Sequence, residues 1–383
     1  MATKSLCPGH PSWESAAALT DRVDDGEALA AVSREMNVPR NTARNWVEKV
    51  RRHRNTDPAI RDSMDAVGTG LVPALTWAKT KSEDGTSYSV LLKPPPVEDN
   101  ILDRIGAAFE GMAAAPVVAA PRSIMADLLT LYPVFDAHIG MQAWGKDTRG
   151  EDYDLKIATS QMSAAFEKLF AITPNSSEAV VLIGGDFFHI DDQRNETPAS
   201  KHNLDVDGRF FKVIDEGVAV LKRIIPRVLE KHQTVSVRVL RGNHDEHSHL
   251  MLTYALFEHF RDNPRCTVEK SPQLDLFMRQ WGKCAIFAHH GDRRFKAETA
   301  ALYLSDVCEF WSATRHRHMF TGHIHHETGK DVGPMKWESL RAFCPPDNYA
   351  ATMGYASRRA LQAITFHKED GLVLRASDPV SRQ

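Results

Sequence analysis

Five short polar clusters in this 383-residue chain carry side chains suited to binding metal ions. Each one directly follows a short run that is apolar or alternates apolar with polar residues, the pattern of a buried strand. Because open α/β sheets place their chemistry at the carboxyl ends of strands, we expect the clusters to converge on one site. The clusters are Asp136-Ala-His138, Gly184-Gly-Asp186, Gly242-Asn-His-Asp245, His289-His-Gly291 and Gly322-His-Ile-His325.

Seven of these side chains are candidate metal ligands, with carboxylate, amide or imidazole donors. One divalent ion takes about four to six donors, so seven are enough for two ions if one carboxylate is shared. Asp186 is the natural bridge, because a carboxylate has two oxygens and the preceding Gly184 and Gly185 let the backbone approach a metal closely. Two ions about 3.5–4 Å apart would lower the pKa of a shared water toward neutrality. The candidate ligands are Asp136, His138, Asp186, Asn243, His290, His323 and His325.

The order Asp-x-His, Gly-Asp, Gly-Asn-His-Asp, His-Gly and Gly-His-x-His resembles the five motifs of the calcineurin-like metallophosphoesterase superfamily, and in particular its DNA-repair exonuclease branch. The resemblance covers the chain from Asp136 to His325. It implies two packed mixed β-sheets flanked by helices, with a dimetal site at one edge and Asp186 as the bridge. The ligands implied are Asp136, His138 and His325 for one metal, and Asn243, His290 and His323 for the other.

The resemblance also implies a role for His244, which would not bind metal but would stand beside the scissile phosphate. There it would protonate the leaving oxygen or stabilise the transition state, and Asp245 would orient its imidazole. His290 is preferred to His289 as the ligand because it directly precedes the glycine of its motif.

Other polar residues near the motifs are candidates to contact the substrate phosphate. For each of them, a solvated or hydrogen-bonded loop role is an equally good interpretation. The long polar segment 189–206 directly follows a Gly-Asp motif, and we expect it to line the substrate groove. The candidate phosphate contacts are Arg241, His189 and Arg293.

The donor types restrict the metal. Carboxylate, amide and imidazole donors without thiolate suit Mn²⁺, Fe, Zn²⁺ or Mg²⁺ rather than Ca²⁺ or copper, and Mn²⁺ is the first choice by resemblance. The five cysteines are scattered singly, without a CxxC pair. We therefore expect reduced thiols rather than a disulfide framework.

Two helical patterns precede the metal motifs. Apolar residues recur at helical spacing within 27–36 and 41–50, with a short turn between them. This arrangement resembles a helix-turn-helix, with 41–53 as a basic recognition helix suited to contact DNA phosphates. A small helical bundle used for protein contact or oligomerisation is the alternative. The residues expected to contact DNA are Arg40, Arg44, Lys49 and Arg51.

These patterns divide the chain into three segments: 13–55 as the helix-turn-helix, 56–125 as a hairpin, helix and linker region, and 126–383 as the catalytic domain. The dipeptide Asp84-Gly85 predicts a tight hairpin turn. After residue 126, strands alternate with helices, which predicts an α/β core. Helices are expected over 154–172, 207–232 (kinked or shortened at Pro226), 249–262 and 296–311, with a closing hairpin over 361–376.

The composition is that of an ordinary globular chain, with 42% hydrophobic and 25% charged residues and a formal charge of -3. No apolar run approaches the roughly 18 residues that span a bilayer, and no export signal is recognisable. We therefore expect a cytoplasmic protein without a membrane partner. Its oligomeric state is left open.

The leading functional hypothesis is a dimetal-dependent phosphoesterase that cleaves phosphodiester bonds in DNA. A second hypothesis is a phosphatase or phosphodiesterase acting on a small phosphoester, a nucleotide or a phosphoprotein, with the amino-terminal helices used for assembly. A third is a DNA-binding regulator whose metal domain does not turn over substrate. The complete ligand set and the presence of His244 weigh against the third.

Overall fold

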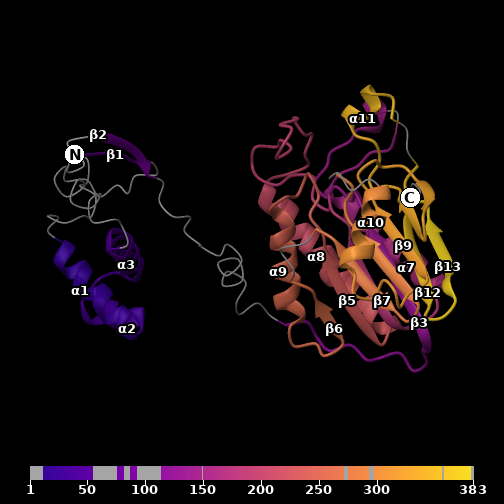
Figure 1. Ribbon diagram of the computed structural model, residues 1–383, viewed down its shortest axis with the longest axis horizontal. Helices are drawn as coiled ribbons and strands as arrows, with labels where there is room; N and C mark the ends of the chain where they lie inside the picture. The colour runs from indigo at the N-terminus through magenta and orange to yellow at the C-terminus, as the bar shows by residue number, and fades with distance from the viewer. Residues whose placement is uncertain are drawn as a thin grey trace. The chain divides into compact units, whose positions relative to one another are not determined.

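The computed structural model describes residues 12–54, 76–81, 87–92, 114–148, 150–270, 275–292, 297–355 and 358–380. Two compact units divide the chain, residues 1–99 and residues 100–383. Figure 1 labels their helices and strands along the chain. In the part of the chain that is described, none of the helices combines the length and apolar character needed to cross a membrane.

The described part of the first unit contains three packed helices: α1 (Trp13–Asp24), α2 (Leu29–Glu35) and α3 (Arg40–Arg54). The last two are the expected pair, but α1 was not predicted. Its Leu19 packs against Val32 of α2 and Val47 of α3 in the core of this unit. Three of the six apolar residues of α1 are the alanines Ala16 to Ala18, and alanine gives only a weak amphipathic signal.

A two-stranded antiparallel hairpin, β1 (Thr76–Lys81) and β2 (Ser87–Leu92), also belongs to the first unit. Its pairing confirms the predicted hairpin, although the Asp84-Gly85 turn itself lies outside the described residues. The helix expected within 56–125 falls on residues that are not described.

Two mixed sheets form the centre of the second unit, as the resemblance implied. The order of the six-stranded sheet is β13-β12-β3-β4-β5-β6, with β3 to β6 parallel. The order of the five-stranded sheet is β10-β11-β9-β8-β7, with β8, β9 and β11 parallel. The strands are β3 (Met125–Val134), β4 (Ser176–Ile183), β5 (Thr234–Val239), β6 (Cys266–Val268), β7 (Phe277–Trp281), β8 (Cys284–Ala288), β9 (His316–Thr321), β10 (Thr328–Val332), β11 (Met335–Ser339), β12 (Leu361–His367) and β13 (Gly371–Asp378).

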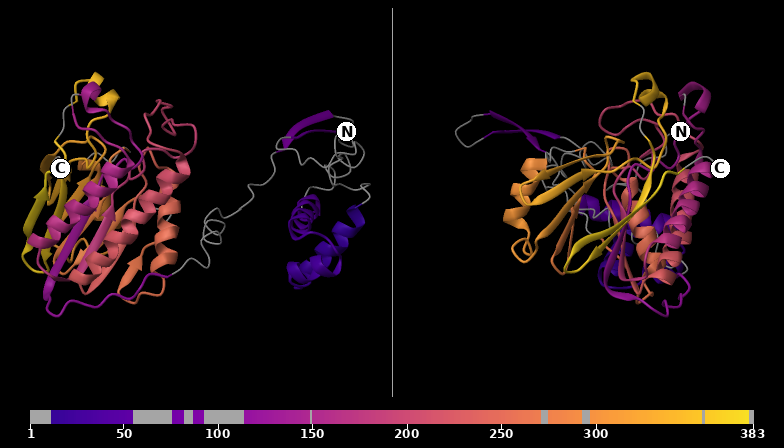
Figure 2. Two further views of the ribbon diagram at one scale, coloured as in Figure 1. Left: turned by 180° about the vertical axis from the view of Figure 1, so that it is seen from behind. Right: turned by 90° about the vertical axis from the view of Figure 1, so that its right-hand side faces the viewer.

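Helices cover both outer faces. Helices α7 (Leu155–Ile172), α8 (Phe210–Lys231) and α9 (Ser248–Phe260) lie side by side over the six-stranded sheet (Figure 2), and α10 (Ala297–Val307) packs against the five-stranded one. These are the four predicted helices, except that α10 ends four residues early. Of the two effects expected at Pro226, a kink or a shortening, the shortening does not occur, because α8 continues through it to Lys231.

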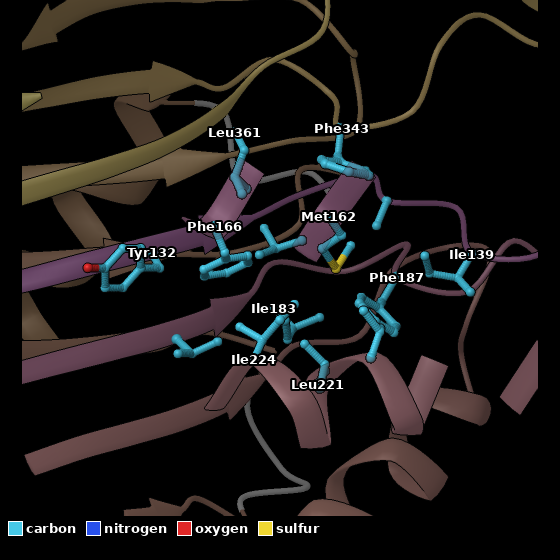
Figure 3. Packing of buried hydrophobic residues seen from close by; sticks show 14 of the residues in the cluster. Tyr132, Ile139, Met162, Phe166, Ile183, Phe187, Leu221, Ile224, Phe343 and Leu361 are labelled. Atoms are coloured by element: carbon cyan, nitrogen blue, oxygen red, sulfur yellow. The ribbon is translucent and has the colours of Figure 1, made fainter. Parts of the chain in front are cut away.

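Alternate residues of the central strands face opposite cores. In β4, Val180 and Leu182 pack between the two sheets, whereas Val181 and Ile183 pack under the helices. Figure 3 shows Ile183 among the side chains of this second core, close to residues of the covering helices such as Leu221. Strands buried on both faces read as continuous apolar runs, which explains why their ends could be located in the sequence.

Candidate metal centre

The five predicted strands end directly before the five polar clusters. β3, β4 and β5 of one sheet lead to Asp136, Asp186 and Asn243, and β8 and β9 of the other sheet lead to His290 and His323. Each sheet therefore contributes ligand candidates to a single centre.

The backbone at this edge adopts an uncommon conformation. Five of the seven candidate ligands have a positive φ, which L-residues rarely adopt and which costs about 1–3 kcal/mol each. Such conformations persist only where the surrounding structure enforces them, and they cluster at functional sites. The residues are Asp136 (50°), His138 (46°), Asp186 (51°), His323 (69°) and His325 (59°).

The candidate ligands for the first ion lie close together. Single ligand atoms of Asp136, His138 and Asp186 all lie within 4.8 Å of one another. His325 joins them, with its Nε2 atom 3.3 Å from Nε2 of His138 and 3.6 Å from Oδ1 of Asp136. All four side chains implied for this ion, including the bridge, meet here.

Asp186 is also part of the second group. Its carboxylate and the imidazoles of His290 and His323 supply ligand atoms within 4.8 Å of one another. The Nε2 atom of His290 lies 3.1 Å from Oδ2 of Asp186 and 3.1 Å from Oδ1 of Asn243. Among the described residues, His289 belongs to none of these groups, which supports the choice of His290 as the ligand.

Asp245 has a different role from the one expected. Its carboxylate accepts hydrogen bonds from the backbone N–H groups of four residues, at 2.7 to 3.3 Å, and none of these is with the imidazole of His244. The imidazole is oriented instead by the carbonyl oxygen of His189, to which Nδ1 donates at 2.9 Å. Asp245 therefore holds the backbone that carries Asp186. The four donors are Asp186, Phe187, Phe188 and Gly242.

We expect Asp245→Ala to lower the free energy of unfolding by roughly 3 kcal/mol or more, because each buried N–H left without an acceptor costs about 1–3 kcal/mol. Urea denaturation of the metal-free protein measures this loss. The matched control is Asp262→Ala, whose side chain is 67% exposed, with an expected change of about 0.5 kcal/mol or less. Equal midpoints for the two variants would contradict the assigned role.

Burial dominates the electrostatics of the centre. It raises the pKa of Asp136 and of Asp245, and the nearby charge of Asp186 raises both further. For Asp186, burial is outweighed by the imidazoles of His290 and His244, so its pKa lies well below the usual value. For His290 the balance is reversed: burial lowers its pKa, but the carboxylates raise it above the usual value.

Burial favours the neutral imidazoles of His138 and His325. Burial lowers the pKa of His138 well below its ordinary value and that of His325 to about 4. Neutral imidazoles and an ionised carboxylate are the protonation states that bind metal. The buried carboxylates favour positive charge at this centre, as the raised pKa of His290 shows, and divalent cations would supply that charge in place of its proton. The residues therefore fit two divalent ions sharing Asp186, although the donor set does not fix which metal.

Two of the proposed phosphate contacts are buried, and His189 adjoins the candidate ligand His138. The guanidinium of Arg241 pairs with three carboxylates at 2.9 to 3.1 Å, those of Glu246, Asp275 and Asp292, and its side chain is only 8% exposed. His189 is 1% exposed and places Nδ1 3.0 Å from Nδ1 of His138. These placements favour structural roles over substrate contact. Arg293 lies outside the described residues.

A cavity of about 800 Å³ adjoins the centre. Its wall includes candidate ligands, His244 and residues 197–204 of the segment that was expected to line a groove. It also includes Cys344, whose sulfur lies within 4.8 Å of ligand nitrogens of His138 and His325. Sequence reasoning missed this thiol. The missed signal is its position shortly after β11, the strand that pairs with β9 beside the cluster of His323 and His325.

Comparison with solved structures finds distant likenesses. A predicted phosphoesterase from Streptococcus pneumoniae TIGR4, otherwise uncharacterised, is 11% identical, with a TM-score of 0.28, over 66% of this chain and 98% of its own. Zn²⁺-complexed Vps29 from Entamoeba histolytica is 11% identical, with a TM-score of 0.28, over 66% and 99%. A novel archaeal phosphodiesterase is 12% identical, with a TM-score of 0.31, over 66% and 98%.

No family model matches the chain, and no curated protein matches it. The arrangement of its own side chains is therefore the basis on which a function can be assigned.

Proposed function

We propose that this chain is a divalent-metal-dependent phosphodiesterase that acts on nucleic acid, with DNA as the first candidate substrate. The observation that carries the proposal is the convergence of the seven candidate ligands around Asp186, beside a cavity whose wall includes His244. Because all seven candidate ligands are present, a DNA-binding regulator without catalytic activity is disfavoured.

The proposed chemistry assigns separate tasks to the residues. Bound ions would supply Lewis-acid stabilisation of the phosphate oxygens and a nucleophilic water of lowered pKa. Because Nδ1 of His244 donates to the carbonyl of His189, Nε2 is the nitrogen that, in the imidazolium form, would give a proton to the leaving oxygen. Asp245 fixes the backbone of Asp186, so the central carboxylate is positioned before the substrate binds.

The preference for DNA rests on the first unit. Arg40, Arg44 and Lys49 of α3 are exposed and suited to contact phosphates. Arg51 is less available than expected, because its Nε atom donates to the carboxylate of Asp24 on α1 at 2.8 Å. A small phosphodiester or nucleotide is the second candidate, because none of the described residues that line the cavity is a lysine or an arginine.

Hydrolysis of defined substrates tests the proposal. With Mn²⁺, we expect the wild-type protein to hydrolyse methyl p-nitrophenyl phosphate and labelled DNA, and with EDTA neither. The triple variant Arg40→Ala, Arg44→Ala, Lys49→Ala should lower kcat/KM for DNA at least about tenfold at low salt, by a smaller factor at higher salt, and leave the small ester unaffected. If the protein hydrolysed the ester but not DNA, the second candidate would be favoured. If it hydrolysed neither substrate with any divalent ion, the enzyme assignment would be rejected.

A further inference from the structure

The cavity beside the metal centre has a second wall that the proposed phosphate chemistry does not use. Two segments far apart in the chain form it, residues 197–204 and residues 344–355. The second of these contains the short helix α11 (Asn348–Thr352), which lies at one end of the unit (Figure 1). Because the same cavity also contacts the candidate ligands, a substrate with its phosphate at the ions would extend toward these segments.

Both segments place aromatic rings in the wall of the cavity. The rings of His202 and Tyr349 lie 5.7 Å apart between centroids, with 35° between their planes. Tyr349 is 57% exposed and Tyr355 is 58% exposed, although both line the cavity. Aromatic side chains with this much accessible surface are suited to stack on a planar group of the substrate.

The polar groups of this wall include uncharged hydroxyl and amide groups. Thr197, Ser200 and Asn203 offer hydroxyl and amide groups, which form hydrogen bonds with the edges of nucleobases. A wall for a phosphate backbone needs lysine or arginine, and neither occurs among the described residues that line the cavity. A wall for a lipid chain would lack these hydroxyl and amide groups. Exposed aromatic rings beside hydroxyl and amide groups therefore fit a nucleobase better than they fit a phosphate backbone or a lipid chain.

We propose that this wall, formed by His202, Asn203, Tyr349 and Tyr355 and here named the base wall, binds the nucleobase of the nucleotide that carries the scissile phosphate. The inference rests on the proposed function, since it places the phosphate at the metal centre. The cavity volume of about 800 Å³ lies within the range of about 300–1,000 Å³ for small-molecule sites, so one nucleotide fits. The substrate class is then a terminal or short nucleotide unit rather than a duplex lying across the site.

Binding of two matched ligands tests the base wall without relying on turnover. Adenosine 5′-monophosphate and ribose 5-phosphate share the sugar and the phosphate and differ in the base. Calorimetric titration of the full-length Mn²⁺-loaded protein should show tighter binding of the nucleotide by about tenfold or more, the contribution expected from stacking of one base. Chromatography after each titration confirms that the ligand is intact.

Substitutions then locate the contribution of the base. Tyr349→Ala and Tyr355→Ala should each reduce the preference for the nucleotide severalfold, and together abolish it, without changing the affinity for ribose 5-phosphate. The matched control Tyr303→Ala, at an exposed tyrosine of α10 outside the cavity wall, should keep the wild-type preference. Circular dichroism spectra identical to wild type establish that the variants are folded.

The outcomes separate this inference from the proposed function. Equal affinity of the wild-type protein for the two ligands would overturn the base wall, even if phosphodiesters are hydrolysed. A preference for the nucleotide that survives both tyrosine substitutions would overturn the assignment to these residues. A preference that depends on the tyrosines would support the base wall, and if no phosphodiester were then hydrolysed with any divalent ion, the proposed function alone would fail.

Discussion

Replacing Asp186 with alanine is expected to lower kcat/KM for Mn²⁺-dependent phosphodiester hydrolysis about 10³-fold or more. Asp186 is the carboxylate common to both ligand groups, so its loss removes a donor from each proposed ion. The charge stabilisation that such ions supply is worth several kcal/mol, and each 1.36 kcal/mol corresponds to a factor of ten in rate. Metal analysis of the purified variant should show fewer than two ions per chain.

Two further variants make the result specific. Asp186→Asn keeps the shape of the side chain and one oxygen but loses the charge, and we expect it to be nearly as inactive as the alanine variant. Asp192→Ala removes an aspartate of the neighbouring segment whose carboxylate pairs with Arg194 at the surface, and it should retain wild-type activity. Full activity of Asp186→Ala with an unchanged metal content would end the proposal of a bridged pair.

Replacing His244 with alanine is expected to lower kcat about 10²–10⁴-fold on a substrate with an alkoxide leaving group, while metal content and KM change little. His244 lines the cavity, and its Nδ1 atom is engaged by the carbonyl of His189, so the remaining Nε2 is the atom available to the leaving oxygen. A thymidine dinucleotide is a suitable substrate, because its leaving group is an alkoxide that needs a proton.

The leaving group distinguishes the two roles that His244 could have. With methyl p-nitrophenyl phosphate, the departing nitrophenolate is stable without a proton, so we expect the loss in His244→Ala to be small. Equal losses on both substrates would instead mean that His244 stabilises transition-state charge. His326→Ala is the control, because it removes another histidine that lines the cavity, one whose Nδ1 atom bonds to the carbonyl of Ile324. A loss of bound metal in His244→Ala would contradict its non-ligand role.

The ends of the strands were predictable from the sequence because the central strands are buried on both faces. Continuous apolar runs mark such strands, and the polar residues that follow them must lie at their carboxyl ends. This reasoning identified the segments containing Asp136, Asp186 and His290 before their packing was known. It extended to α7, α8, α9 and α10 of the second unit, where the apolar stripes are long.

Relations between loops were not predictable in the same way. Asp245 accepts hydrogen bonds from residues 186–188, and this depends on how two loops pack, which no local pattern records. The three carboxylates around Arg241 also come from separate loops. Cys344 was overlooked because a single cysteine carries no motif, and α1 because alanine marks a helix face poorly.

Each proposed ion would take ligands from both sheets: Asp136 and His138 with His325 for one, and Asn243 with His290 and His323 for the other. The ions would therefore link the two sheets, and the distance between the ions would depend on how the sheets are aligned. Loading the metal would restrain sliding of one layer over the other, so chelation should increase amide exchange in β8 and β9 relative to β3 and β4. Substitutions in the apolar interior between the layers, remote from the phosphate, could then alter catalysis by shifting this alignment.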